Sequence, residues 1–410
     1  MAKIRVNNLT KIFGSKPDKA LKLLQEGCSK QQILRDTGLT VGVNQASFEV
    51  NSGEIFVIMG LSGSGKSTLV RLLNRLIEPT CGSIEIDGEN VVTMSKEQLR
   101  EVRRKKLSMV FQRFALFPHR TVLENVAYGL EIQGLPKEER LTKAKQALEL
   151  VGLAGWENSM PDQLSGGMQQ RVGLARALAN DPDVLLMDEA FSALDPLIRK
   201  DMQDELLELQ SSMHKTIVFI THDLDEALKL GDRIALMKDG KIVQIGTPEE
   251  ILTNPADEYV EKFVEDVDMS KVLHAEHIMK RPETITLDKG PRVALQLMRD
   301  SGVSSLYVVD KRKVLLGVVT ADAVSQAKNE DLSLEEVMET RVPTVQPDTL
   351  LHDLFDLIAF SPVPLAVVNK ENRLLGVVVR GAVLGGLAGK VNLAPVPATE
   401  QTVERVDLVG

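Results

Sequence analysis

Short apolar runs alternate with longer amphipathic stretches along the first two thirds of the chain. The runs at 54–60, 183–190 and 215–223 are continuous rather than alternating, which is typical of strands buried on both faces. Between such runs lie stretches with apolar residues at helical spacing, for example at 135–153. The pattern predicts an α/β domain with a parallel sheet covered by helices on both faces.

Two segments depart from this pattern. Residues 233–246 hold two apolar runs joined by an Asp-Gly dipeptide, which favours a tight hairpin. Residues 15–40 indicate an insertion of two short helices, each ending in glycine, that serves either as a docking surface or as a solvated cover on the core. We expect the domain to span residues 1–265 and to include a helical subdomain at about 113–182.

The last third of the chain contains an internal sequence repeat. The phrase VLLGVVTAD at 314–322 returns as RLLGVVVRG at 373–381. The pattern of each copy predicts the element order helix, strand, helix, strand, strand. One copy alone cannot bury the face of its sheet, so we expect the two copies to pack together as a pseudo-symmetric α+β module. The predicted parts are a linker at 266–275, copies at 276–328 and 334–388, and a loosely held tail at 389–410.

Composition narrows the functional classes. With 43% hydrophobic and 26% charged residues, the 410-residue chain resembles soluble globular proteins of more than one domain. A net charge of −9 argues against a nucleic-acid partner. Cys28 and Cys81 stand apart from any histidine cluster, which argues against structural zinc. No apolar run reaches the roughly 18 residues of a membrane span, and the first residues lack a secretory core, so we expect a cytoplasmic chain.

The segment GLSGSGKST at 60–68 directly follows a predicted strand and precedes a predicted helix. In that context its glycines let backbone N–H groups curl around phosphate oxygens, and the helix start adds a positive dipole end. Lys66 is placed to reach the β- and γ-phosphates and Ser67 to ligate Mg²⁺. The predicted nucleotide ligands are Gly60, Ser62, Gly63, Ser64, Gly65, Lys66, Ser67 and Thr68.

The predicted strand in LLMDEA ends on two acids. A carboxylate at the end of a buried strand is costly unless it binds something, so Asp188 is predicted to hold Mg²⁺ and to complete the ATP site. Glu189 beside it is predicted to be the general base that activates water. These features together indicate a nucleoside triphosphatase.

The stretch LSGGMQQRVGLARAL at 164–178 opens a second predicted helix with Ser165, Gly166 and Gly167. One ATP does not need two anion-binding helix starts in one chain, so this one should face a phosphate bound to another copy. The stretch resembles the signature motif of ABC ATPases, which implies a RecA-like P-loop core with a helical subdomain.

The resemblance assigns further residues. It implies that Gln112 is the Q-loop glutamine near the metal and that Gln169 belongs to the signature that acts in trans. It also places Asp195 in the D-loop at a dimer interface, His222 at the γ-phosphate, and Phe13 against adenine. The implied mechanism is a homodimer that closes on two ATP molecules and reopens after hydrolysis.

Longer stretches, among them MVFQRFALFPH and LLMDEAFSALDPL, resemble the ATPase subunit of glycine betaine (osmoprotectant) importers of the OpuA type. That resemblance implies a separate transmembrane permease with a substrate-binding domain, and a position at the cytoplasmic face of the membrane. The alternatives are an ABC importer for another solute, a soluble ABC ATPase that acts on nucleic acid or ribosomes, and a binding protein with an inactive ATPase.

The repeated copies resemble a tandem pair of CBS domains, which usually bind adenosine ligands. Nucleotide-binding CBS motifs often end in Thr or Ser, two residues and Asp, whereas Thr320 and Asp322 are one residue closer and the second copy reads VRG. Arg380 in that copy suits a phosphate of a cyclic dinucleotide such as cyclic di-AMP. Sensing of ionic strength and a dimerising spacer are the other interpretations.

Overall fold

The computed structural model describes residues 2–112, 115–265 and 267–387. The chain divides into two compact units, residues 1–267 and 268–410, and each is described by itself. Within the described ranges, none of the helices combines the length and the apolarity that crossing a bilayer requires.

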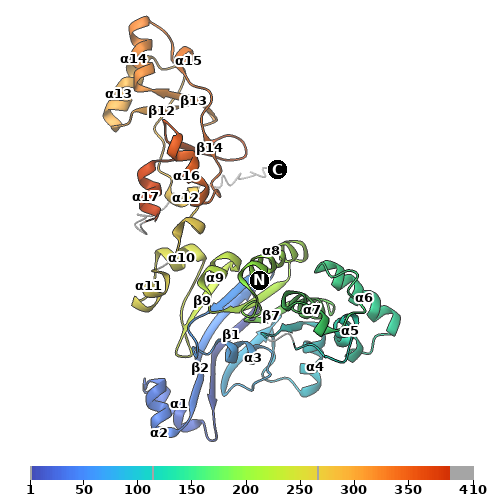
Figure 1. Cartoon of the computed structure of the whole chain (residues 1–410). Helices are drawn as coiled ribbons and strands as arrows, with labels where there is room; N and C mark the ends of the chain where they lie inside the picture. The colour runs from blue at the N-terminus through green and yellow to red at the C-terminus, as the bar shows by residue number, and fades with distance from the viewer. Residues whose placement is uncertain (1, 113–114, 266, 388–410) are drawn as a thin grey trace, which may run out of the picture. The chain divides into compact units, whose positions relative to one another are not determined.

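A six-stranded sheet forms the centre of the first unit, with strand order β10-β9-β3-β8-β7-β6 (Figure 1). Five of the strands run parallel, and β10 pairs antiparallel with β9 through the predicted Asp-Gly hairpin. Every residue of β3, β7 and β8 is buried, which explains their continuous apolar runs. The strands are β3 (Ile55–Met59), β6 (Leu107–Val110), β7 (Val184–Asp188), β8 (Thr216–Thr221), β9 (Arg233–Lys238) and β10 (Lys241–Gly246).

Two hydrophobic clusters cover the two faces of this sheet. Along β3, Ile55, Val57 and Met59 belong to one cluster, whereas Phe56 and Ile58 belong to the other. The prediction of a sheet buried on both faces is therefore confirmed. The flanking helices are α3 (Lys66–Leu73), α8 (Pro196–Met213), α9 (Leu224–Leu230), α10 (Pro248–Thr253) and α11 (Glu258–Val264).

A second, antiparallel sheet packs on one of these clusters, and the sequence did not predict it. Its strand order is β2-β1-β4-β5. Apolar residues of β1, β2 and β4 join the cluster that also holds Phe56 and Ile58. The predicted α/β core is therefore present and has this second sheet in addition. The strands are β1 (Ala2–Phe13), β2 (Thr40–Asn51), β4 (Cys81–Ile86) and β5 (Glu89–Asn90).

The insertion between β1 and β2 forms two helices, α1 (Asp18–Gln25) and α2 (Lys30–Thr37), as predicted. Ser29 caps the start of α2, and Gly38 ends it in a left-handed conformation. Ala20 and Ile33 pack with residues of the flanking strands in a small core of their own, made of Ile12, Ala20, Ile33, Leu39 and Val41.

A helical region lies beside the central sheet and contains α5 and α6, which Figure 1 shows next to α7. Thr121 and Glu124 form a capping box at the start of α5. The predicted helix within 135–153 is α6. The helices are α4 (Lys96–Lys105), α5 (Val122–Ile132), α6 (Lys137–Leu150) and α7 (Gly166–Leu178), with a 3₁₀ turn at Pro161–Gln163.

The second unit consists of the two predicted copies, each with a three-stranded sheet in the order helix, strand, helix, strand, strand. A further helix closes each copy. The first copy contains α12 (Ala275–Ile278), β11 (Thr284–Ile285), α13 (Pro291–Ser301), β12 (Ser305–Val309), β13 (Leu315–Thr320) and α14 (Ala321–Glu330). The second contains α15 (Leu334–Val337), β14 (Thr344–Val345), α16 (Leu351–Phe360), β15 (Leu365–Val368), β16 (Leu374–Val378) and α17 (Arg380–Leu387).

Each copy contributes a short segment that forms backbone hydrogen bonds with a strand of the other copy, in a pseudo-twofold arrangement. Val318 of β13 and Glu339 of the second copy bond each other's backbone, and Lys280 does the same with Val377 of β16. A cluster that includes Tyr307, Val309, Ala366 and Val368 joins the two sheets. The expectation that the copies pack together is confirmed.

The predicted linker differs from the structure. Residues Met269–Lys271 form a 3₁₀ turn, and Met269, Ser270 and Leu273 are buried. Leu273 accepts a backbone hydrogen bond from Leu351 at 2.7 Å, so this segment packs into the second unit instead of standing free. The predicted tail at 389–410 lies outside the described residues.

Candidate active site

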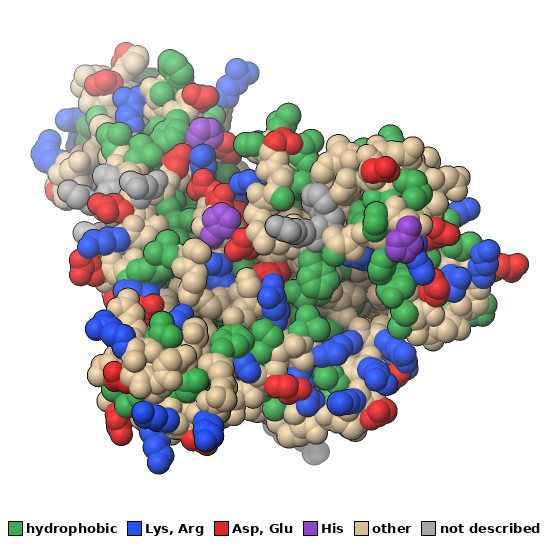
Figure 2. Space-filling model, turned by 60° about the horizontal axis from the view of Figure 1, so that its bottom comes forward, with side chains coloured by type: hydrophobic (Ala, Val, Ile, Leu, Met, Phe, Trp, Pro, Cys, Tyr) green, Lys and Arg blue, Asp and Glu red, His purple; other side chains and the backbone are tan. Residues whose placement is uncertain are grey.

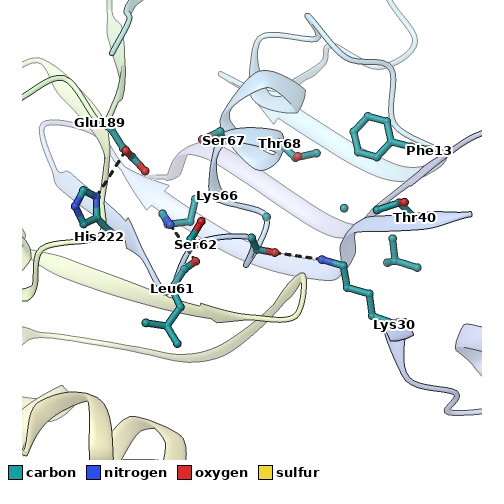
Figure 3. Close-up of a pocket in the computed structure, with 14 residues that line it drawn as sticks. Phe13, Lys30, Thr40, Leu61, Ser62, Lys66, Ser67, Thr68, Glu189 and His222 are labelled. Carbon is teal, nitrogen blue, oxygen red and sulfur yellow. Dashed lines mark hydrogen bonds and ion pairs between the residues drawn. The ribbon is translucent and has the colours of Figure 1, made fainter. Parts of the chain in front are cut away.

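A cavity of about 690 Å³ opens over the loop that joins β3 to α3 (Figure 3). The loop forms its floor, and the start of β2 and Phe13 form one wall. Glu189 and His222 lie on the other side of the loop in Figure 3. Segments from six separate parts of the chain therefore meet at one cavity, and most of the predicted nucleotide ligands line it.

The loop can take its shape only with glycine at two points. Gly60 and Gly65 have φ angles of +147° and +106°. A Cβ on Gly60 would lie 2.2 Å from the carbonyl oxygen of Met237, and one on Gly65 would lie 2.3 Å from that of Gly42. Because Gly65 is also the N-cap residue of α3, it has no side chain to bond the first N–H groups of that helix. An anion in the cavity can take that place.

Lys66, the first residue of α3, is buried, and its side chain turns back onto the loop. Its Nζ donates to the carbonyl oxygens of Gly60 and Leu61 at 2.8 and 3.3 Å. Burial lowers the pKa of Lys66, while the negative charges of Glu189 and Asp188 act in the opposite direction. The left-handed glycines, the open helix start and a buried lysine together fit the phosphates of ATP.

The residues proposed for Mg²⁺ offer oxygen ligands of the kind this ion prefers. Ser67 lines the cavity, and Asp188 is 4% exposed at the end of β7. Nη2 of Arg71 lies 3.6 Å from the Asp188 carboxylate. Gln112 turns its Nε2 toward Glu189 and the hydroxyl of Ser192, so its Oε1 is the atom that would serve a metal.

Glu189 has a strained backbone, with a φ of +48°. Its N–H donates to the carbonyl of Ile220 on the neighbouring strand, which holds it in this conformation. The Glu189 carboxylate lies 3.1 Å from Nε2 of Gln112 and 3.6 Å from Nδ1 of His222. The three predicted hydrolytic side chains thus meet beside the cavity, where the carboxylate can accept a proton from water.

The residues predicted to act in trans lie on a separate surface. Ser165 caps α7 by accepting a hydrogen bond from the N–H of Met168, and Asp195 caps α8 by accepting one from Ile198. Both are exposed. A Cβ on Gly167 would lie 2.6 Å from Ile198, so the starts of α7 and α8 lie close together.

Two predicted ligands have other partners in the structure. Gln169 donates to the carbonyls of Pro161 and Leu164, so it supports the loop before α7 instead of presenting its amide to a phosphate. Arg380 donates to the carbonyls of Ile358, Ala359 and Ser361, which end α16. The end of α16 therefore engages Nε and Nη2 of this guanidinium, and phosphate binding by Arg380 stays a prediction.

The remaining CBS candidates, Thr320 and Asp322, lie at the start of α14. Thr320 accepts a hydrogen bond from the N–H of Ala323 at 3.4 Å as the N-cap residue. Asp322 is exposed in the first helical turn. Their placement is what helix capping alone would give.

Several residues that line the cavity were not predicted from the sequence, among them Lys30 and Thr40 of the wall. Both belong to the insertion or its junction with β2. Phe13 lines the same wall with 38% of its surface exposed, and Nζ of Lys11 lies 5.2 Å from its ring. Phe13 is thus partly exposed at the cavity, and its stacking on adenine stays a prediction. No motif spacing pointed to Lys30, because it lies 30 residues before the loop and among other lysines.

The sequence model of the ABC transporter family matches residues 43–192, and that of the CBS domain matches 275–330 and 334–389. Among solved structures, the dimeric structure of MJ0796, a bacterial ABC transporter cassette, is 33% identical with a TM-score of 0.51. The likeness covers 60% of this chain and 98% of that one. A post-hydrolysis form of that cassette, bound to ADP and Pi, matches equally well. The fold and the site define an ATPase of the ABC class.

Relatives narrow the family. The glycine betaine transport ATP-binding protein OpuAA of Bacillus subtilis is 67% identical over 94% of this chain and 93% of its own length. The glycine betaine/carnitine protein GbuA of Listeria monocytogenes is 60% identical over 95% and 98%. The glycine betaine/proline betaine protein ProV of Escherichia coli is 51% identical over 94% and 97%. The chain belongs to this family of ABC transporter ATP-binding proteins with paired CBS domains.

Proposed function

We propose that this chain is the ATP-hydrolysing subunit of an importer for glycine betaine or a similar quaternary amine. The observation that carries the hydrolytic part is the meeting of Glu189, Gln112 and His222 beside the loop that holds Lys66. The substrate class is supported by the names of relatives that align over nearly the whole chain.

In this proposal Lys66 and the N–H groups of the loop and α3 bind the β- and γ-phosphates, and the ring of Phe13 stacks on adenine. Glu189 accepts a proton from the attacking water, and His222 steadies the γ-phosphate. When bound, Mg²⁺ neutralises charge that develops on the phosphates, and Ser67, Asp188 and Gln112 would hold it.

Two copies then form the working unit. Ser165, Gly166 and Gly167 form the start of α7, and this helix start would complete the nucleotide site of the partner copy. Asp195 would lie at the same interface. Loss of one phosphate removes a bridge between the copies, so hydrolysis reopens the pair. A separate permease with a substrate-binding domain would convert this motion into import, and it would hold the chain at the cytoplasmic face of the membrane.

The CBS pair would regulate this cycle. An adenosine ligand such as cyclic di-AMP, or the ionic strength of the medium, would be the signal. The pseudo-symmetric packing of the copies supports a module that changes shape as one body. Titration of the full chain with cyclic di-AMP, with AMP as a control, separates the two signals: binding supports a nucleotide signal, whereas no binding together with a salt-dependent ATPase rate supports ionic strength.

The function is tested by purifying the chain with its membrane partner and measuring ATP-driven uptake of radiolabelled glycine betaine into proteoliposomes. Uptake that requires ATP and is lost in Glu189→Gln supports the proposal. No ATP-dependent uptake of betaine in the presence of the membrane partner, or uptake of other solutes but not of betaine, contradicts it.

A further inference from the structure

The helical insertion reaches the nucleotide cavity through one side chain, Lys30. Its Nζ donates to the carbonyl oxygen of Gly63, at the tip of the phosphate loop, at 3.2 Å. Figure 3 shows this side chain extending from the insertion to the loop, on the side of Phe13 and Thr40, whereas Glu189 and His222 lie on the far side. The cavity therefore contains a second cation that the family motifs do not account for.

The insertion is built to hold Lys30 in this place. Ser29 caps α2, so the helix begins at Lys30 itself, and Ile33 one turn later is fully buried. Ile33 packs with Ile12 and Val41, which flank or line the same cavity wall. The backbone from which Lys30 extends is thus attached to the wall by a hydrophobic core.

The chemistry of the ammonium group suits a phosphate. It carries three donors, and the bond to Gly63 uses one, so the group can bond a phosphate oxygen as well. Two lysines on opposite sides of the loop match a polyphosphate better than one. Resting on the function proposed above, we propose that Lys30 is a nucleotide-binding residue that contacts the phosphates shared by ATP and ADP. The insertion is thereby coupled to whether the site is filled.

The test measures ATP and ADP affinity of the full chain for wild type, Lys30→Gln and Lys30→Arg, with Lys19→Gln as the matched control on the exposed face of α1. Gln can still donate to the Gly63 carbonyl but carries no charge, so it separates a phosphate contact from a structural tie. Lys30→Gln should weaken ATP and ADP equally, by about 3- to 10-fold at low salt, and should flatten the salt dependence. Lys30→Arg should bind nearly as wild type does, and Lys19→Gln should match wild type.

Affinities of Lys30→Gln within twofold of wild type overturn the inference, and so does a loss confined to ATP. If wild type itself binds neither nucleotide, the proposed function fails, which is a different result. Hydrogen exchange across residues 18–37 provides an independent readout. ADP should slow exchange there in wild type and less in Lys30→Gln, and equal protection in both also counts against the contact.

Discussion

Nε2 of Gln112 lies 3.1 Å from the carboxylate of Glu189, although 77 residues separate them. Gln112 follows β6 and Glu189 directly follows β7, and these strands are parallel neighbours in the sheet. The carboxyl ends of parallel strands meet at one edge, so the sheet itself brings the two side chains together. A displacement of Gln112 would therefore change the hydrogen bond that it donates to the proposed base, Glu189.

Replacing that base should separate binding from hydrolysis. Glu189→Gln keeps the shape of the side chain but removes the group that accepts a proton, so turnover should fall by about 10²–10⁴-fold. ATP affinity should change little, because Lys66 and the loop are intact. Phosphate release and equilibrium binding measure the two effects, with exposed Glu97→Gln on α4 as the control. Unchanged turnover would refute the assignment of Glu189.

Sites shared between two copies should show complementation. Lys66→Ala removes the phosphate lysine, and Ser165→Arg blocks the helix start that would face the partner's nucleotide. Each variant alone should lose at least nine tenths of its ATPase activity. In a mixed dimer one site has both intact parts, so mixing should restore a measurable fraction of wild-type activity. Absence of recovery in a mixture shown to contain heterodimers would count against sites completed in trans.

Much of the nucleotide site could be predicted because its parts are contiguous in sequence. The phosphate loop needs a strand, glycines, a lysine and a helix in immediate succession, and α7 likewise begins with its own motif. The strands β3, β7 and β8 were predictable because burial on both faces leaves continuous apolar runs in them, interrupted only at the strand ends of β7 and β8.

The rest depends on contacts between distant segments. The antiparallel pairing of β1 with β4 joins residues about 80 positions apart, and the register shifts within β1 interrupt its alternation. Lys30 enters the cavity only because the core around Ile33 holds the insertion against the wall. Arg380 was expected to bind phosphate, yet the end of α16 lies beside it and accepts hydrogen bonds from its Nε and Nη2. The spacing of residues in the sequence does not indicate which carbonyl groups will accept hydrogen bonds from such an arginine.

Gly317 and Gly376, the glycines of the repeated LLGVV phrase in the CBS pair, should differ in their tolerance of alanine. A Cβ on Gly376 would lie 2.5 Å from the sulfur of Met279, a flexible side chain. A Cβ on Gly317 would meet Met338 and also the backbone oxygen of Glu339 at 2.7 Å, which cannot swing away. Gly376→Ala should cost about 1–2 kcal/mol and Gly317→Ala more, about 2–3 kcal/mol.

Calorimetry of the full chain measures these costs. The unfolding transition whose melting temperature ATP does not change is assigned to the second unit. Gly381→Ala in α17 is the control, since a Cβ there meets no described heavy atom within 4 Å. It should be neutral or stabilising by up to about 1 kcal/mol, because alanine favours helix over glycine. Equal melting of all three variants would show that the copies are not packed as closely as described.

A buried acid beside the His222 segment should make stability depend on pH. Glu226 in α9 is 5% exposed, and burial raises the pKa of its carboxyl, with hydrogen bonds from Thr221 and Gln203 offsetting part of the effect. The neighbouring charges also act on it: Asp223 raises the pKa and Arg199 lowers it. A carboxyl with a raised folded-state pKa contributes stability below its unfolded pKa and loses that contribution as pH rises through the folded value.

Glu226→Gln cannot titrate and can still accept the hydrogen bond that Gln203 donates at 3.0 Å. Measured without nucleotide, its melting temperature should therefore rise relative to that of wild type as the pH increases from 5 to 8. Exposed Glu97→Gln should instead follow wild type at each pH. If the Glu226→Gln and wild-type curves run parallel across this range, the carboxyl is equally protonated in the folded and unfolded chains, and burial does not govern its charge.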